Sequence, residues 1–355
     1  MDARHRVLSA LSARGGVAAL WSVGFSGPKR QLLRRYCDAL GMPSLPLHRR
    51  PAAYSVALAW GMTPAAGCFA RVEDGFIRSV GLGADLAKPL SWVFDTRGIY
   101  FDATQPSDLE WLLQNKQFSP QELVRAAAIR QSLISTRLTK YNVGNGVWVR
   151  PPTEQRLVLV AGQVETDASI RLGSHTVQTN VDLLKAARKR CPDDYLIYKP
   201  HPDVSAGLRA GGVMASQALQ WCDEVVLDAN MADLLVQVDA VHVMTSLTGF
   251  EALLRGVEVT CYGTPFYAGW GLCNEPYVLP SAQARRARHL SIDQLVAATL
   301  VDYPCYLHPD NDTLMSVENA IGMLQTQRQG AGVKVHEGRA KRFVLRWLAK
   351  LQGRF

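Results

Sequence analysis

Two adjacent carboxylates, Glu73 and Asp74, end an apolar, strand-like run of the sequence and are followed by Gly75 and Arg78. An Asp-Gly pair is typical of tight turns, in which Gly75 would supply the positive φ angle. A carboxylate presented by such a turn could also serve as a general acid or base. This stretch alone is compatible with both interpretations, so the choice depends on what the rest of the chain places near it.

A second polar group follows the apolar strand predicted at 156–161. Gln163, Glu165, Asp167 and Ser169 occupy alternate positions there. Ligands of parallel α/β sheets bind at the carboxyl ends of the strands, which makes this group a candidate site. By spacing alone an ordinary polar loop fits equally well.

A third group begins where the strand ending near Tyr198 reaches a Lys-Pro-His-Pro-Asp sequence. A lone histidine is commonly a structural residue, but the prolines at 200 and 202 hold this segment extended. Lys199, His201 and Asp203 are therefore presented rigidly, and a lysine with a histidine is well suited to a phosphate group.

The fourth group lies at the start of a predicted helix in the stretch MTSLTGFEALLRG. Thr248 and Glu251 have the spacing of a capping box, and Gly256 fits the position just after the helix. A well-capped helix explains this pattern. The free N–H groups of its first turn, with the hydroxyls of Ser246 and Thr248, would also bind an anion.

The predicted elements explain how these groups could meet. The first half mixes strands at 17–25 and 54–60 with a helix at 29–40 and a hairpin-like stretch at 92–102. After the Gly-Asn-Gly and Pro-Pro linker around 144–152, short apolar strands alternate with helices, which is typical of a doubly wound parallel sheet. We therefore expect an α/β protein with domains at 1–152 and 153–327 and a tail at 328–355.

Composition narrows the class of protein. A chain of 355 residues with 48% hydrophobic and 20% charged residues indicates two globular domains. Its seven cysteines form no C-x-x-C pair, which favours reduced thiols in the cytoplasm and gives no zinc pattern. We expect no targeting segment and no membrane span, because the apolar run at the N-terminus is interrupted and no other approaches about 18 residues.

The net charge of +8 belongs mainly to the tail, where eight Lys or Arg residues accompany one acidic residue between 328 and 355. This location argues against a nucleic-acid binder. The tail segment 339–355 places Phe343, Trp347 and Leu351 on one helical face with basic residues around it. Such a helix is either solvated or bound to an anionic membrane surface.

The second half of the chain thus offers groups that could bind a phosphate, and the first half offers a carboxylate pair. This division would suit a two-domain glycosyltransferase that binds a nucleotide-sugar in one domain. The motifs VEDGFIRSVGLG, GQVETDASI, YKPHPDV, TSLTGFEALLRG and PFYAGWGL, in this order, resemble those of the capsule polysaccharide linker β-Kdo transferases. The resemblance covers roughly residues 17–310. The chain corresponds to one module and is most similar to the second module of the two-module members.

The resemblance implies a GT-B-like fold, in which two Rossmann-like domains face a cleft. It also implies CMP-β-Kdo as donor, a Kdo-bearing phospholipid as acceptor and retention of configuration by double displacement. Asp167 is then the expected nucleophile and Glu73 the expected acid/base, with Asp74 as its neighbour or substitute. The domain expected at 1–152 would then face the acceptor, and the domain expected at 153–327 would bind CMP.

For a CMP-sugar donor we also expect a set of binding residues in these motifs. They are Lys199, His201, Pro202, Ser246, Thr248, Glu251, Gln163, Glu165, Ser169 and Arg78. No metal or other cofactor is expected, because the lone D-x-D at 310–312 is a weak pattern in a polar loop. The expected location is the cytoplasmic face of the bacterial inner membrane, with capsule assembly proteins or a companion Kdo transferase as further partners.

Two alternatives stay open at this point. An inverting transferase that uses a CMP-activated sialic acid would need one base and no covalent intermediate. A catalytically silent module would bind the capsule glycolipid or assembly partners without turnover. The carboxylates and His201 argue against the silent module, although they do not establish turnover. They do not distinguish a retaining from an inverting transferase.

Overall fold

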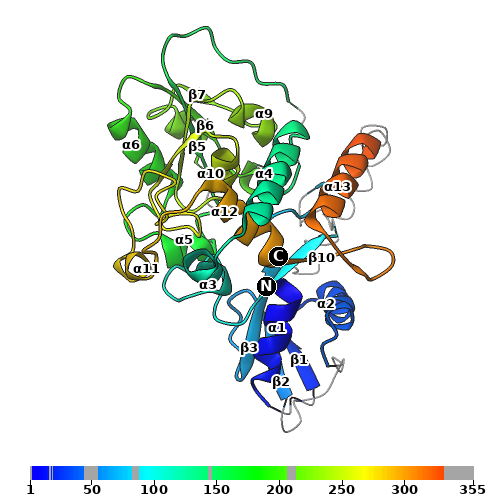
Figure 1. Cartoon of the computed structure of the whole chain (residues 1–355). Coiled ribbons are helices and arrows are strands. Elements are labelled where there is room, and N and C mark those ends of the chain that lie inside the picture. The colour runs from blue at the N-terminus through cyan, green and yellow to red at the C-terminus, as the bar shows by residue number, and fades with distance from the viewer. Residues whose placement is uncertain are drawn as a thin grey trace.

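The computed structural model describes residues 2–15, 17, 19–43, 55–81, 88–142, 146–205 and 213–331. Two β-sheets organise this part of the chain, one of six strands and one of five. They lie in two lobes, with the first strands of the chain in the lower lobe of Figure 1 and the strands of the middle of the chain in the upper lobe. The molecule is thus an α/β protein with two sheet-based lobes.

The six-stranded sheet has the order β1-β2-β3-β4-β10-β11. Its strands are β1 (Ala19–Val23), β2 (Ser55–Trp60), β3 (Cys68–Asp74), β4 (Ser91–Asp95), β10 (Pro304–Leu307) and β11 (Leu314–Met315). The first three run parallel and the remaining pairs are antiparallel. The hairpin expected at 92–102 is wrong, because β4 pairs with β3 and β10 and a turn follows it.

Two helices pack against this sheet, α1 (Ala3–Ser12) and α2 (Gly27–Leu40). The apolar residues of α2 recur at helical spacing, which turns Leu33, Tyr36 and Leu40 toward the sheet. Tyr36 stacks on Trp92 of β4, with 5.0 Å between the ring centroids. This packing fixes α2, whose first turn carries a residue of the cleft described below.

The five-stranded sheet is parallel throughout and has the order β7-β6-β5-β8-β9. Its strands are β5 (Leu157–Ala161), β6 (Tyr195–Lys199), β7 (Glu224–Val225), β8 (Ala240–Val243) and β9 (Glu258–Cys261). Every residue of β5 is buried, as expected for a strand covered on both faces. The doubly wound parallel sheet predicted from the sequence is confirmed.

The remaining helices connect and cover the sheets. They are α3 (Asp108–Asn115), α4 (Pro120–Ser135), α5 (Ala168–Gly173), α6 (Asn180–Arg190), α7 (Pro202–Ser205), α8 (Ala215–Ala218), α9 (Met231–Leu235), α10 (Leu247–Leu254), α11 (Pro280–Arg285), α12 (Ile292–Val296), the π-helical η2 (Ala297–Asp302) and α13 (Val317–Ala331). Val158 and Val160 of β5 pack toward Leu183 of α6, whereas Leu157 and Leu159 belong to the core on the α10 side.

The lobes exchange segments across the predicted domain boundary. Helix α4 lies before residue 152 but packs against α12 and α13, and Figure 1 shows it beside the upper lobe. Strands β10 and β11 come from the predicted second domain, yet they complete the six-stranded sheet. The division into 1–152 and 153–327 therefore separates most strands of the two sheets but does not follow the packing.

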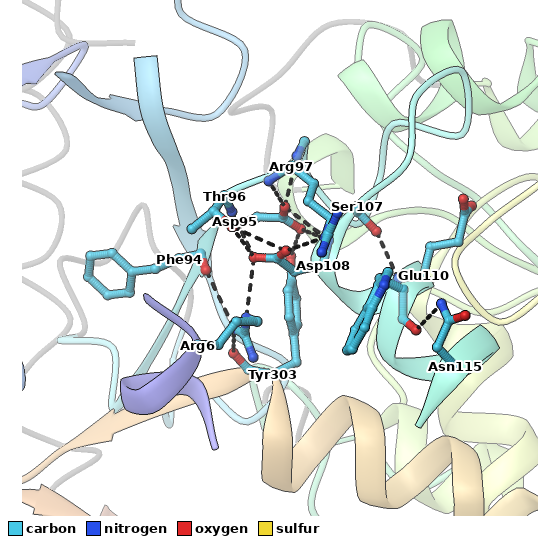
Figure 2. A network of polar contacts seen from close by, with 12 residues as sticks. Arg6, Phe94, Asp95, Thr96, Arg97, Ser107, Asp108, Glu110, Asn115 and Tyr303 are labelled. Atoms are coloured by element: carbon cyan, nitrogen blue, oxygen red, sulfur yellow. Dashed lines mark hydrogen bonds and ion pairs between the residues drawn. The ribbon is translucent and has the colours of Figure 1, made fainter. Parts of the chain in front are cut away.

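A buried polar network fixes the returning segment to the first sheet (Figure 2). Arg6 of α1 donates to the carbonyl oxygens of Tyr303 and Asp302 at 3.0 and 2.9 Å, and to Asp108 Oδ2 at 3.2 Å. The hydroxyl of Tyr303 donates to Asp95 Oδ2 at 2.8 Å. Buried carboxylates are stable only with such partners, so this network joins α1, β4, α3 and the start of β10 into one unit.

Among the residues that the structure describes, no helix is both long and apolar enough to cross a bilayer. The predicted amphipathic segment at 339–355 lies outside the described residues, which end at position 331.

Candidate active site

A cleft of about 1020 Å³ lies between residues of the two sheets. Twelve predicted site residues line it: Glu73, Asp74, Arg78, Gln163, Asp167, Ser169, Lys199, His201, Pro202, Ser246, Thr248 and Glu251. The first three lie on or just after β3, Lys199 ends β6, and the others follow β5, β6 and β8. The carboxyl ends of these parallel strands share one edge of their sheet, which explains why segments so distant in sequence meet.

Glu165 is the one predicted site residue outside this lining. Its Oε1 accepts hydrogen bonds from the backbone N–H of Asn180 at 2.7 Å and from Asn180 Nδ2 at 3.2 Å. Asn180 begins α6, so the Glu165 carboxylate stabilises a helix N-terminus rather than facing the cleft. We therefore leave Glu165 out of the proposed site.

The turn after the carboxylate pair differs from the expected one. Strand β3 continues through Asp74, which pairs with Trp92, and the N–H of Gly75 donates to Ser91 O at 2.9 Å. Gly75 does not have a positive φ, so that expectation is wrong. Glycine is needed for a different reason, because a Cβ at this position would collide with the side chain of Ser91.

Asp74 and Arg78 form an ion pair in the cleft wall. Arg78 Nε donates to Asp74 Oδ2 at 2.7 Å, and Trp92 Nε1 donates to Asp74 Oδ1 at 3.0 Å. Arg78 Nη1 also donates to Ser79 Oγ at 2.8 Å. Both carboxylate oxygens of Asp74 are thus engaged, and Arg78 is fixed by it. The pair is better suited to positioning its neighbours than to proton transfer.

Glu73 has the properties of an acid/base residue. Its Oε1 accepts the backbone N–H of Asp74 at 3.0 Å, while Oε2 lies beside Gly61, where an added Cβ would be 3.2 Å away. Burial, and next the charge of Asp74, raise the pKa of Glu73 to about 7, against the opposing effect of Lys140 and Lys29. A carboxyl group of this pKa exchanges a proton readily near neutral pH.

Asp167 is held in the cleft lining by the start of α5. It is the N-cap residue, and its Oδ1 accepts the backbone N–H of Ser169 at 3.3 Å. Gln163 Nε2 donates to Ser169 Oγ and to Thr245 Oγ1, both at 2.9 Å. These contacts fix the loop after β5 and leave Asp167 Oδ2 without a hydrogen bond from the described residues.

Lys199 ends β6 and His201 follows it, and both line the same cleft. Lys199 Nζ donates to Leu227 O at 3.4 Å, and burial lowers the pKa of this lysine while the charge of Asp228 acts against the shift. His201 Nδ1 accepts the N–H of Asp203 at 3.2 Å. A buried ammonium group and an imidazole on a proline-bounded segment are suitable ligands for a phosphate.

The start of α10 is capped differently from the prediction. Ser246 is the N-cap residue and accepts the N–H of Thr248 at 3.2 Å, so the expected Thr248–Glu251 capping box is wrong. Glu251 instead accepts the N–H of Lys140 at 2.8 Å, and burial raises the pKa of its carboxyl group. The left-handed Gly256, with φ of 72°, ends this helix region as predicted.

Comparison with known proteins places this chain in a family. The family model described as capsule polysaccharide biosynthesis protein matches residues 64–145 and 133–306. The chain belongs to this family. It is also 47% identical over 258 residues to the capsule polysaccharide modification protein LipA of Neisseria meningitidis serogroup B, which covers 73% of this chain and 36% of LipA. The chain thus spans about a third of the length of this curated relative.

Two solved structures are similar over nearly their whole length. They are the β-Kdo 2,7 transferase and the β-Kdo 2,4 transferase of Thermosulfurimonas dismutans KpsC. The identities are 35% and 29%, the TM-scores 0.72 and 0.75, and the matches cover 87% and 88% of this chain and 99% of each KpsC chain. The predicted resemblance to capsule linker β-Kdo transferases and the predicted GT-B-like fold are confirmed.

Among the cleft residues that sequence reasoning missed are two lysines, Lys29 and Lys140. Lys29 lies in the amphipathic helix α2 and Lys140 follows α4, so both resemble ordinary surface lysines in the sequence. Only the tertiary structure brings them to Glu73. The pattern at 310–312 is not part of the cleft lining, and Asp312 pairs with Arg35.

Proposed function

We propose that this chain transfers Kdo from CMP-β-Kdo to a Kdo-bearing phospholipid acceptor, with retention of configuration, in capsule linker synthesis. The observation that carries the proposal is that Asp167 and Glu73 line one cleft from different lobes. Lys199 and His201 lie with Asp167 among the segments that follow the parallel strands. The similarity to two β-Kdo transferases over 99% of their chains supports the choice of sugar.

In the first step, a carboxylate oxygen of Asp167 attacks the anomeric carbon of Kdo as the bond to the CMP phosphate breaks. Lys199, His201 and the N-terminus of α10 stabilise the negative charge that the leaving phosphate carries. The products are CMP and a covalent Kdo-enzyme ester. The proposed mechanism uses no metal, because these protein groups supply the positive charge.

In the second step, Glu73 removes the proton of the acceptor hydroxyl, whose oxygen attacks the anomeric carbon and displaces Asp167. Two inversions at the same carbon give net retention. Glu73 fits the role better than Asp74, because Asp74 accepts hydrogen bonds from both Arg78 and Trp92. Proton transfer of this kind contributes about 10² to 10⁴ in rate.

The proposal is tested by incubating the chain with freshly generated CMP-Kdo and a Kdo-bearing lipid in buffer containing EDTA. We expect CMP release that depends on the acceptor and, by NMR, a product with the β configuration. An inverted product, or turnover of a CMP-sialic acid instead, would contradict the proposal in favour of an inverting transferase. No CMP release with any acceptor would favour a silent glycolipid-binding module.

We further propose that the chain works at the inner face of the bacterial inner membrane, beside capsule assembly proteins or a companion Kdo transferase. Residues 332–355 of the basic tail predicted at 328–355 lie outside the described residues, and they would bind anionic lipid, each basic residue contributing on the order of 1 kcal/mol. Deleting 332–355 is expected to weaken cosedimentation with vesicles rich in phosphatidylglycerol. Unchanged cosedimentation would contradict the role of the tail.

A further inference from the structure

Two lysines of the cleft have no part in the mechanism above. Lys29 belongs to the first turn of α2, and Lys140 follows α4 in a short turn. Both line the cleft together with Glu73. Among the described residues, neither ammonium group forms an ion pair with a carboxylate. A partly buried ammonium group that has no carboxylate at ion-pair distance is a suitable partner for an anionic ligand.

The side chain of Lys29 reaches from α2 to Trp60, the last residue of β2, and lines the cleft with Glu73. Its Nζ is 3.4 Å from the centroid of the Trp60 ring, a cation–π contact that holds the ammonium in place. Trp60 is followed by Gly61, the residue that borders Glu73 Oε2. Trp60 and Gly61, which follow one another at the end of β2, therefore position the Lys29 ammonium and border the Glu73 carboxylate.

Lys140 is positioned by a turn that is braced from both lobes. Its backbone N–H donates to Glu251 Oε1 at 2.8 Å, and its carbonyl accepts the N–H of Ser79 at 3.3 Å. Asn142, in a left-handed conformation with φ of 53°, donates from Nδ2 to Ser79 O at 3.0 Å. A non-glycine residue adopts this conformation only where its surroundings stabilise it, so these contacts define the conformation of the turn that carries Lys140.

The charges of these lysines are coupled to the carboxylate pair. Burial lowers the pKa of Lys29, while the charges of Asp74 and Glu73 oppose this effect. Burial also acts to lower the pKa of Lys140, but two neighbouring tyrosines and the same carboxylates outweigh it and hold that pKa above its ordinary value. Both ammonium groups thus interact electrostatically with Glu73 and Asp74.

We propose that Lys29 and Lys140 form a subsite that binds the carboxylate of an acidic sugar beside Glu73. The inference deepens the proposed function, on which it rests for the identity of the sugar. Arg78, expected among the donor-binding residues, is already paired with Asp74. A neutral sugar would offer these lysines no carboxylate, so the subsite would select for a sugar that carries one. That sugar is either the Kdo of the donor or the terminal Kdo of the acceptor.

The test compares Lys29→Gln and Lys140→Gln with the native chain. Lys185→Gln is the matched control, since Lys185 also lies over a tryptophan, with Nζ 5.7 Å from the Trp221 ring centroid, but outside the cleft lining. Free Kdo and its methyl ester are titrated into each protein and followed by ligand-observed NMR. KM is then measured separately for CMP-Kdo and for the Kdo-lipid acceptor.

We expect the native chain and Lys185→Gln to bind Kdo about 10- to 100-fold more tightly than its methyl ester, the value of one charge-assisted hydrogen bond. Each cleft substitution should remove this preference. A rise confined to the acceptor KM assigns the carboxylate to the acceptor, and a rise confined to the CMP-Kdo KM assigns it to the donor.

Equal binding of Kdo and its ester by the native chain would overturn the subsite, and this comparison requires no variant. Both KM values within twofold of native in both cleft variants would overturn it as well, even with the transferase active. A carboxylate preference that depends on Lys29 and Lys140, without any CMP release, would instead uphold the subsite and contradict the proposed function.

Discussion

Replacing Asp167 with Asn is expected to abolish a covalent Kdo adduct and to lower turnover of CMP-Kdo by about 10³-fold or more. The reason is that an amide oxygen cannot displace the CMP phosphate as a carboxylate oxygen can. Intact-protein mass spectrometry after incubation with CMP-Kdo measures the adduct directly. The native chain should gain the mass of one Kdo residue, and the variant should keep its original mass.

The substitution is chosen so that the fold survives it. Asp167 is the N-cap of α5, and Asn is as good a cap as Asp, so the contact with the Ser169 N–H can persist. Asp2→Asn is the matched control, because Asp2 caps α1 in the same way far from the cleft lining. A native level of adduct in Asp167→Asn would place the nucleophile elsewhere and contradict the double displacement argued here.

The second sheet is predicted well because its strands and helices are indicated by short patterns of neighbouring residues. Strand β5 is a continuous apolar run, and the Ser119, Pro120 and Glu122 pattern in the sequence matches a complete capping box at the start of α4. The same rule fails at Thr248 and Glu251, where the competing partner is the Lys140 N–H from another part of the chain. A spacing rule cannot detect such a partner.

Long-range pairing also explains the other differences from prediction. Strand β10 joins the first sheet beside β4 after about 200 intervening residues, which no local pattern indicates. Gly75 is read from sequence as a turn residue, but its role is to avoid Ser91 on the neighbouring strand. For the site, the motifs predict most lining residues, whereas Lys29 and Lys140 carry no motif and are found only when the lobes are assembled.

Replacing Glu73 with Gln is expected to lower kcat/KM for the acceptor by about 10² to 10⁴ and to flatten its dependence on pH. The base must be ionised to accept the proton of the hydroxyl. Since the pKa of Glu73 is raised to about 7, the ionised fraction, and with it the rate, should climb as the pH rises through 7 in the native chain. Glu318→Gln, at a surface ion pair with Arg125, should leave this profile unchanged.

Asp74→Asn separates the two carboxylates. The charge of Asp74 is one cause of the raised pKa of Glu73, after burial. Its removal, together with the release of Arg78, should therefore lower that pKa and move the rising limb of the pH profile to lower pH, with activity retained at higher pH. If Asp74 were the base, its amide would instead abolish the limb and Glu73→Gln would keep it. The pH profiles of these two variants thus decide which carboxylate accepts the proton.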